Sequence, residues 1–367
     1  MLTEWLMQNA SPVIRYRTLV EIIKSTDEKL IQRTKEEVLA LPQTQKRLAN
    51  AANLDFARIH GANDTYLENV LPMLEDFGLT IGDVKGLRIP KNIPDNFPDA
   101  QFLDKLIAYP FLLRAGFPYS ELLDYAQERI DTIYDFTRHG NYAIYDADEN
   151  HPRLPKAFRT RPVIKPEIAS AEAIRLPLIY DMVLLAAAYR HLPPATQAKI
   201  DNIVDYVLDN QYDWLKTGYG ILNRSPGKYY SMGWDCIKPF NSNRYYGNQN
   251  MTRLLLYAQF PTAVKSKWFS HAVDYFAQFR TGDDTYIFTK GFMGEKNSNW
   301  VLGAHNSLGE NRRKKNWMEV ESTFYMCKLL ANMRDTTGGE YVRLFPPDIA
   351  YQTLFGKDYA FDPVDIG

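Results

Sequence analysis

Hydrophobic residues recur along most of the chain with the period of an amphipathic α-helix. Ser11 and Pro12 suit the N-cap and first turn of a helix, and the apolar residues from Val13 to Ile23 share one broad face. The same pattern predicts helices at residues 27–50, 64–77, 99–115, 120–138, 167–192, 195–215, 250–260, 265–279 and 316–333. Only residues 142–145 and 285–289 resemble short strands. The sequence therefore predicts an all-α protein with little sheet.

A short pattern recurs three times along the chain. A helix end, a glycine-containing turn and a segment like Tyr-x-Ile follow one another, starting at Ile130, Val204 and Val273. The starts lie 74 and 69 residues apart, which favours stacked or circularly arranged helix pairs. Coincidence among common residue types is the alternative.

This repeat resembles that of terpenoid cyclases and protein prenyltransferases. The opening from Trp5 through Pro12 to Leu19 is similar to the start of bacterial prenyltransferase-like proteins of undefined function, and Asn316-Trp317 is similar to their closing segment. The resemblance implies an α/α toroid, with an inner ring of helices around a cavity and an outer ring around it. It also implies an isoprenoid-type ligand. The domains expected on this basis are N-terminal helices at 1–60, the toroid at 61–340 and a C-terminal extension at 341–367.

Composition and charge argue against several classes of function and location. Lys and Arg number 43 against 44 Asp and Glu, for a net charge of -1, which argues against nucleic acid as the main partner. The two cysteines do not make a disulfide framework. The first residues lack the pattern of a signal peptide, and the most apolar stretch, 176–192, contains charged residues and Pro177. We therefore expect a cytoplasmic protein without a membrane span, and the oligomeric state stays open.

Aromatic residues make up 13% of the chain. Such a share is typical of proteins in which aromatic side chains line a cavity or groove. It is also found where Tyr and Phe side chains simply pack the hydrophobic core. Both interpretations stay open.

Three charged residues fall on apolar helix faces, where an unpaired charge is costly. Asp181 lies within the apolar helix expected at 171–191, Glu319 near the start of the last helix, and Arg15 on the apolar face of the first. Arg15 is the candidate partner of either acid, which would make that acid structural. Alternatively, the two carboxylates carry out general acid/base chemistry at a cavity. The acidic motif of the toroid cyclases, Asp-x-Asp-Asp, is matched only in part by residues 146–149, which we interpret as a solvated turn.

Metal and cofactor motifs are poorly matched. Prenyltransferases of the toroid fold bind zinc through an Asp, a Cys two residues later and a distant His. Here Asp235 and Cys236 are adjacent, with His305 as the distant histidine. Since three ligands must converge on zinc, we expect no metal and a buried, structural Cys236. No dinucleotide or phosphate-binding loop motif is present, and we expect no cofactor.

Two polar, aromatic loops, at 228–253 and 297–306, suit hydrogen bonding and stacking against a ligand. The predicted ligand-binding residues are Trp234, Tyr245, Tyr246, Asn248, Asn250, Arg253, Trp300, His305 and Asn306. The predicted catalytic residues are Glu319, Asp181 and Asp235. Asn250 also suits a simple helix cap.

The leading hypothesis is a small organic ligand in an aromatic-lined central cavity, with or without catalysis. A carbohydrate-active enzyme that uses paired carboxylates is one alternative, and a helical-repeat scaffold for a protein or peptide is another. A deep central pocket would favour the first two, whereas a filled centre would favour the scaffold.

Overall fold

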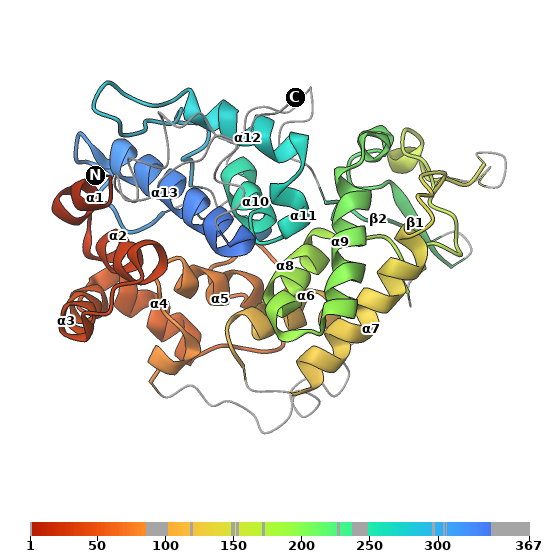
Figure 1. The fold of residues 1–367 in the computed structure, drawn as a ribbon. Coiled ribbons are helices and arrows are strands. Elements are labelled where there is room, and N and C mark those ends of the chain that lie inside the picture. Colours follow the sequence, from red (N-terminus) through yellow and green to blue (C-terminus); the bar gives the residue numbers. More distant parts are fainter. Residues whose placement is uncertain are drawn as a thin grey trace, which may run out of the picture. The chain divides into compact units, whose positions relative to one another are not determined.

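The computed structural model describes residues 2–85, 102–117, 120–147, 151, 154–170, 173–225, 228–236, 249–295, 298–303, 305 and 307–338. In these residues it contains thirteen α-helices and one two-stranded sheet (Figure 1). The prediction of a mainly helical protein is confirmed. The ring arrangement of helix pairs stays a prediction. Within the same residues, no helix is both long enough and apolar enough to cross a membrane.

The chain forms two compact units. Unit 1 combines Met1–Arg88 with Ser242–Gly367, and unit 2 is Ile89–Asn241. The domain boundaries expected from the sequence, after residues 60 and 340, stay a prediction. The helices of unit 1 are α1 (Leu2–Asn9), α2 (Pro12–Arg17), α3 (Glu28–Leu39), α4 (Pro42–Ala52), α5 (Leu67–Glu75), α10 (Gln249–Tyr257), α11 (Pro261–Val264), α12 (Lys267–Ala277) and α13 (Trp317–Thr337). A π-helix, Thr18–Ile23, continues α2.

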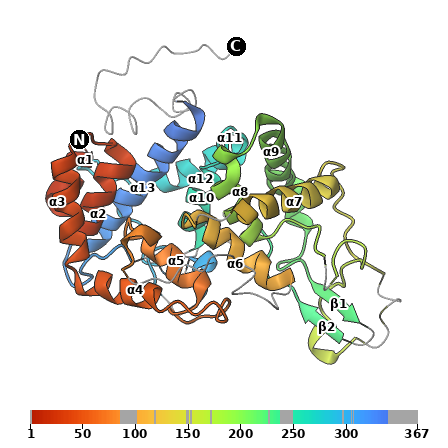
Figure 2. The same cartoon turned by 90° about the horizontal axis from the view of Figure 1, so that it is seen from below.

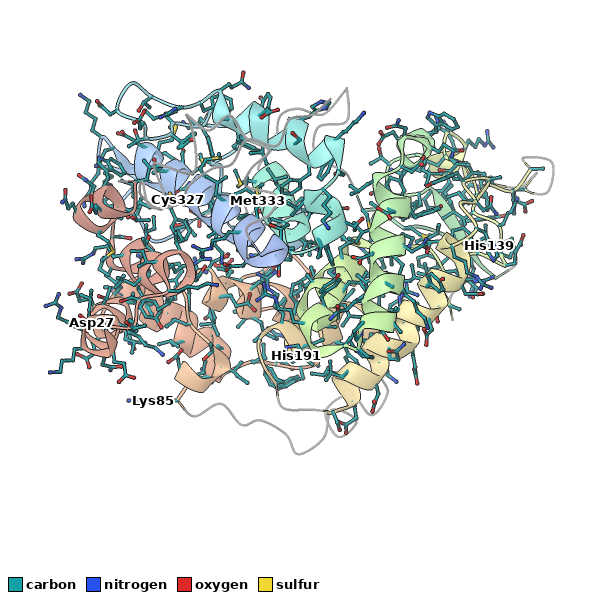
Figure 3. All side chains as sticks on the ribbon, viewed as in Figure 1. Asp27, Lys85, His139, His191, Cys327 and Met333 are labelled. Atoms are coloured by element: carbon teal, nitrogen blue, oxygen red, sulfur yellow. The ribbon has the colours of Figure 1, made fainter. Side chains whose placement is uncertain are left out.

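Helix α13 joins the N-terminal and C-terminal segments that make up unit 1. It packs against α1 and the π-helix from the N-terminal part, and against α10 and α11 from the C-terminal part. Its buried side chains surround it on all sides, including Cys327 and Met333, which Figure 3 labels along the helix.

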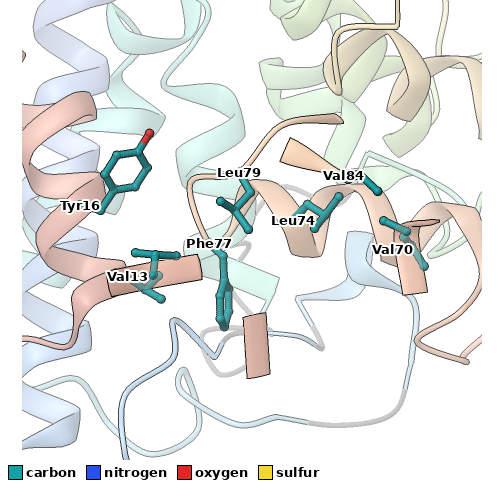
Figure 4. Packing of buried hydrophobic residues seen from close by; sticks show 9 residues of the cluster. Val13, Tyr16, Val70, Leu74, Phe77, Leu79 and Val84 are labelled. Atoms are coloured by element: carbon teal, nitrogen blue, oxygen red, sulfur yellow. The ribbon is translucent and has the colours of Figure 1, made fainter. Parts of the chain in front are cut away.

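A second hydrophobic cluster of unit 1 joins α2 to α5. Val13 and Tyr16 of α2 pack with Val70 and Leu74 of α5 and with Phe77, which follows α5 (Figure 4). This contact fixes the N-terminal helices against the segment that carries the candidate site described below.

Unit 2 contains α6 (Phe102–Arg114), α7 (Ser120–Thr137), α8 (Ile179–Ala188), α9 (Pro194–Leu208), β1 (Ile221–Ser225) and β2 (Lys228–Ser231). Helix α8 packs against α6, and α7 packs against both α8 and α9 (Figure 2). The two strands pair antiparallel, with a register shift between Asn223 and Ser225.

Several element predictions were wrong in their details. The helix expected at 27–50 ends at Leu39, because Pro42 begins a new helix and Leu41 before it is extended. In the described part of the helix expected at 167–192, the chain is helical over α8 and over a 3-10 turn at Tyr189–His191, whereas Ala169, Ile174 and Leu178 form isolated β-bridges. The two expected short strands appear only as isolated bridges, at Tyr145 and Tyr286. Strand β2 lies in the segment interpreted as a polar, aromatic loop, at 228–253.

Candidate functional site

Asp181 is a fully buried helix-capping carboxylate in unit 2. It lies in the first turn of α8, rather than in mid-helix as predicted, and accepts a hydrogen bond from the Leu178 amide at 2.8 Å. Both of its oxygens also bind the Arg129 guanidinium, with Nε–Oδ1 2.7 Å and Nη2–Oδ2 2.8 Å. The prediction that Arg15 is the partner of a buried acid was wrong, because Arg15 binds Glu37 at 2.6 Å.

Arg129 holds the irregular segment that leads into α8. Its guanidinium donates to the carbonyl oxygens of Ile174 and Leu176 as well as to Asp181. Asp181 is 0% and Arg129 3% exposed. Since the pair shields both charges and ties α7 to α8, we infer a structural role for Asp181.

Asp235 and Trp234 lie on the segment that pairs with the start of α8. Asp235 forms an antiparallel bridge with Leu178, and the Trp234 carbonyl accepts from the Ile179 amide at 3.0 Å. The Trp234 ring meets the Tyr180 ring edge-on at a centroid distance of 5.9 Å. Their predicted roles in catalysis and ligand binding stay predictions.

Cys236 is buried, as predicted. Its Sγ donates to the Pro177 carbonyl at 3.3 Å, and its amide donates to the Tyr212 hydroxyl at 2.9 Å. In the part of the chain that the structure describes, no three His, Cys, Asp or Glu residues are grouped so that they could hold a metal ion.

Glu319 belongs to a polar face of α13 in unit 1. It accepts a hydrogen bond from the Thr285 hydroxyl at 2.5 Å. Further along the helix, Thr323 and Ser322 accept from the amides of Tyr286 and Phe288 at 2.9 and 3.0 Å. This face therefore holds the 285–288 segment against the helix.

The other predicted ligand-binding residues are only partly described. Arg253 lies on α10 and is 1% exposed. Asn250 also lies on α10, but the structure does not describe its side chain. Tyr245, Tyr246, Asn248 and Asn306 lie outside the described residues.

Trp300 and His305 are the two predicted residues that lie in a wider polar cluster. The Trp300 amide donates to the Asn69 side chain at 2.8 Å, and its indole Nε1 donates to Asp76 at 2.9 Å. His305 Nε2 lies 2.6 Å from the Ser298 carbonyl, and its Nδ1 lies 4.0 Å from Asp64. We call the following set the His60 cluster: His60, Asp64, Glu68, Asn69, Asn299, Trp300 and His305.

His60 and Glu68 form a close pair within this cluster. His60 Nδ1 lies 2.7 Å from Glu68 Oε1, and the side chains are 40% and 0% exposed. The same oxygen accepts from the Gly61 amide at 2.6 Å. Asn299 lies 3.3 Å from the same histidine nitrogen. A buried carboxylate that orients a partly exposed histidine is an arrangement suited to proton transfer.

Asn69, in the first turn of α5, gives the loop before that helix its shape. Its amide donates to the carbonyl oxygens of Gly61 and Asn63 at 2.8 and 2.9 Å. Gly61 is required because a Cβ there would lie 2.0 Å from the Tyr66 ring. The loop thus presents His60 and Asp64 beside the 298–305 segment.

Charged side chains of both signs lie beside the His60 cluster. Lys46 lies 4.0 Å from Asp64, and the Arg47 guanidinium lies over the Phe77 ring, 4.2 Å from its centroid. Burial lowers the pKa of Arg47, although the nearby carboxylates of Asp76, Glu295 and Asp64 act in the opposite direction. Arg312 Nη1 lies 4.0 Å from Glu295, and Asp76 acts on Arg17, so cations also accompany the carboxylates of Glu295 and Asp76.

Sequence reasoning missed His60, Glu68, Asn69 and Arg47. Their signal is weak. His60 lies in a loop, Glu68 and Asn69 lie in the first turn of α5, and Arg47 lies in the middle of the polar helix α4. The contact between Asn69 and Trp300 spans 231 residues of sequence.

Comparison of the chain with protein-family models, with curated proteins and with solved structures gives no match.

Proposed function

We propose that this protein binds a small organic molecule at the His60 cluster of unit 1. The observation that carries the proposal is the partly exposed His60, held by the fully buried Glu68 at 2.7 Å. Histidine–carboxylate pairs in fixed geometry concentrate at functional sites.

Further support comes from the composition of the cluster. Asn299 contacts His60, and the buried Trp300 and His305, 7% and 5% exposed, lie on the same segment and contact Asn69 and Asp64. A few placed polar groups beside aromatic surface are typical of small-molecule sites. The earlier hypotheses of an isoprenoid-type ligand and a toroid cavity rest on the family resemblance.

The paired-carboxylate alternative gains less support. Asp181 is fully engaged by Arg129 and the Leu178 amide, and Glu319 by the Thr285 hydroxyl. Both carboxylates thus have structural partners, and Asp181 is in addition 0% exposed.

A thermal-shift screen against a library of small organic compounds tests the proposal. A ligand at a hundred times its Kd stabilises the folded state by about 2.7 kcal/mol. We expect His60→Ala to lose the ligand-induced shift, while His271→Ala, at an exposed position of α12, retains it. A ligand that shifts His60→Ala and Trp300→Phe as much as the wild type would contradict the proposed site.

A further inference from the structure

We propose that unit 2 carries a second site, where Tyr229 of β2 reacts with a small carboxylic ester that also bears a carboxylate or phosphate group. Tyr229 is the catalytic residue, His151 and Asp146 are positioning residues that activate its hydroxyl, and Arg161 binds the anionic group of the substrate. The inference goes beyond the proposed function and does not depend on it, because it uses no residue of the His60 cluster.

Asp146, His151 and Tyr229 form a chain of polar contacts. His151 Nε2 lies 3.0 Å from Asp146 Oδ2, and His151 Nδ1 lies 3.4 Å from the Tyr229 hydroxyl. The imidazole is 7% exposed and the Asp146 side chain 21%. A nucleophile, a base within reach of it and a third group that orients the base are the arrangement that activates hydroxyl nucleophiles.

Both nitrogens of His151 have a partner, and these partners determine where the proton lies. An ionised carboxylate only accepts hydrogen bonds, so Nε2, which faces Asp146, carries the proton of the neutral imidazole. Nδ1 is then the acceptor, and the Tyr229 hydroxyl points its proton at it. The 3.4 Å separation is long, as is common for catalytic hydrogen bonds before a substrate binds.

Strand β2 places an arginine on the same face as Tyr229. Side chains two residues apart in a strand point to the same side, so Tyr229 and Ser231 share a face, with about 7 Å between them. The Arg161 guanidinium donates a hydrogen bond to the Ser231 hydroxyl. Arg161 and Ser231 are exposed and Tyr229 is half-buried. A small molecule bound through Arg161 can therefore reach the Tyr229 hydroxyl.

The segment that carries Arg161 is basic. All four charged side chains between residues 156 and 165 are cations, Lys156, Arg159, Arg161 and Lys165. The first two are exposed, and the last donates to a backbone carbonyl at 2.8 Å. The described acids on either side are Asp146, which contacts His151, and Glu167, which is exposed. We assign anion binding to the Arg161 guanidinium, whose planar fork of donors matches carboxylate and phosphate oxygens.

The proposed step is attack by the Tyr229 oxygen on the acyl carbon of the ester. The oxygen bonds to that carbon, the bond to the alcohol oxygen breaks, and the alcohol leaves with the electron pair. The phenol proton passes to His151 Nδ1, Asp146 stabilises the imidazolium, and the imidazolium returns the proton to the leaving alcohol. Water then cleaves the ester formed on Tyr229 and restores its hydroxyl.

Two tyrosine-reactive probes test the site on the full chain, the anionic para-fluorosulfonyl benzoate and its neutral methyl ester. In both reactions the phenol oxygen bonds to sulfur, the S–F bond breaks, and fluoride leaves with the electron pair. Peptide mass spectrometry compares Tyr229 with the adjacent Tyr230, which is 49% exposed.

We expect Tyr229, although it is less exposed, to react with the anionic probe at least about tenfold faster than Tyr230, because a positioned base accelerates such a step by roughly a hundredfold or more. An equal or slower rate at Tyr229 would overturn the inference. This comparison needs no variant.

His151→Ala tests whether the histidine activates Tyr229 or only supports the hairpin. Labelling at Tyr229 should fall to the rate at Tyr230, and free imidazole should restore it. The control His139→Ala, at an exposed position of unit 2, should label like the wild type. Unchanged labelling in His151→Ala, or a loss that imidazole does not restore, would overturn the role of His151.

Arg161→Gln tests the charge class of the substrate. We expect the ratio of the anionic-probe rate to the neutral-probe rate at Tyr229, corrected by the same ratio at Tyr230, to fall at least about threefold, the size of effect of one unit charge near water. The control Arg159→Gln, at an exposed position of the same segment, should keep most of the wild-type ratio. An unchanged ratio in Arg161→Gln would overturn the anionic class of the substrate.

Discussion

Buried carboxylates in this protein differ in their partners. Asp181 binds both Arg129 and a backbone amide. Glu321 of α13 is also 0% exposed, but its partners, the Leu308 amide and Arg312, lie at 3.3 Å. A buried charge is tolerated only as far as its partners compensate for lost solvation. The two carboxylates are therefore expected to respond differently to neutralisation.

Asp181→Asn is expected to destabilise the protein by roughly 3–5 kcal/mol, because it leaves the Arg129 charge buried without a counter-ion. Denaturant unfolding measures the change. The matched control is Glu37→Gln, which breaks the more exposed pair with Arg15 and is expected to cost less than about 1 kcal/mol. Equal small effects of both substitutions would contradict the structural role of Asp181.

Glu321→Gln is expected to change how stability depends on pH. Burial raises the pKa of Glu321 from 4.5 to about 7, and Glu310 and Glu295 add to the shift, whereas Arg312 and the Leu308 amide oppose it. The folded state then binds this proton more tightly than the unfolded state does. Stability should therefore fall as the pH rises from 4.5 to 7, by up to roughly 3 kcal/mol.

Unfolding measured at pH 4.5, 6 and 8 tests this. The Glu321→Gln variant should not lose stability in this way between pH 4.5 and 7. The control Glu36→Gln, at an exposed position of α3, should lose as much stability as the wild type. The same slope in the wild type and Glu321→Gln would show that Glu321 is ionised across the range.

At the scale of elements, α13 organises unit 1 through side-chain to backbone hydrogen bonds. Thr323 and Ser322 accept from the amides of Tyr286 and Phe288, in a segment that pairs only through an isolated bridge at Tyr286. The helix thus substitutes for the partner strand that these amides would otherwise need.

Thr323→Val is expected to cost about 1–3 kcal/mol, because it leaves the buried Tyr286 amide unsatisfied. Hydrogen exchange at that amide should speed up together with the loss of stability. The control, Thr132→Val, removes an exposed hydroxyl of α7 that bonds only within its own helix, and should stay within about 0.5 kcal/mol of the wild type. Unchanged exchange at Tyr286 would contradict the role given to α13.

The sequence pattern predicts most helices but not where each one ends. Apolar periodicity located α5, α6, α7 and α13 because each buries one side or all sides. It failed at Leu41-Pro42, where proline breaks a continuous pattern. It also failed at 167–178, where apolar residues are buried in isolated bridges rather than in a helix. A run of buried apolar residues alone does not distinguish one helix from two, or a helix from isolated β-bridges.

At the scale of the molecule, unit 1 depends on contacts between helices that lie far apart in the sequence. Helix α1, with Leu6 fully buried, packs against α13, although about three hundred residues separate them. Unit 2 is made of one continuous segment, and the buried residues of its cluster around Leu184 come from α7 and α8, with Leu113 of α6 and Leu192 packed against them.

Leu6→Ala is expected to destabilise unit 1 by about 2–5 kcal/mol through the cavity it leaves. Hydrogen exchange should accelerate in α1 and α13 but change little in α7 to α9. The matched substitution Leu184→Ala, at an equally buried position of α8, should accelerate exchange in α7 to α9 and change it little in α1 and α13. The same exchange pattern in both variants would mean that the two units unfold as one.

The candidate site could be predicted only in part. Trp300 and His305 were found from the polar and aromatic character of their loop. Their partners Asn69, Asp76 and Asp64 come from the N-terminal part of the chain, and the His60–Glu68 pair forms because Asn69 and Gly61 shape a loop. Contacts that depend on loop conformation and on distant chain ends leave no period in the sequence.

Hydrogen exchange of the wild-type protein, with and without a ligand from the screen, tests the central claim most directly. If the His60 cluster binds the ligand, exchange should slow in residues 58–69 and 298–303 and stay unchanged in unit 2. A ligand that stabilises the protein but slows exchange only outside these two segments would contradict the claim.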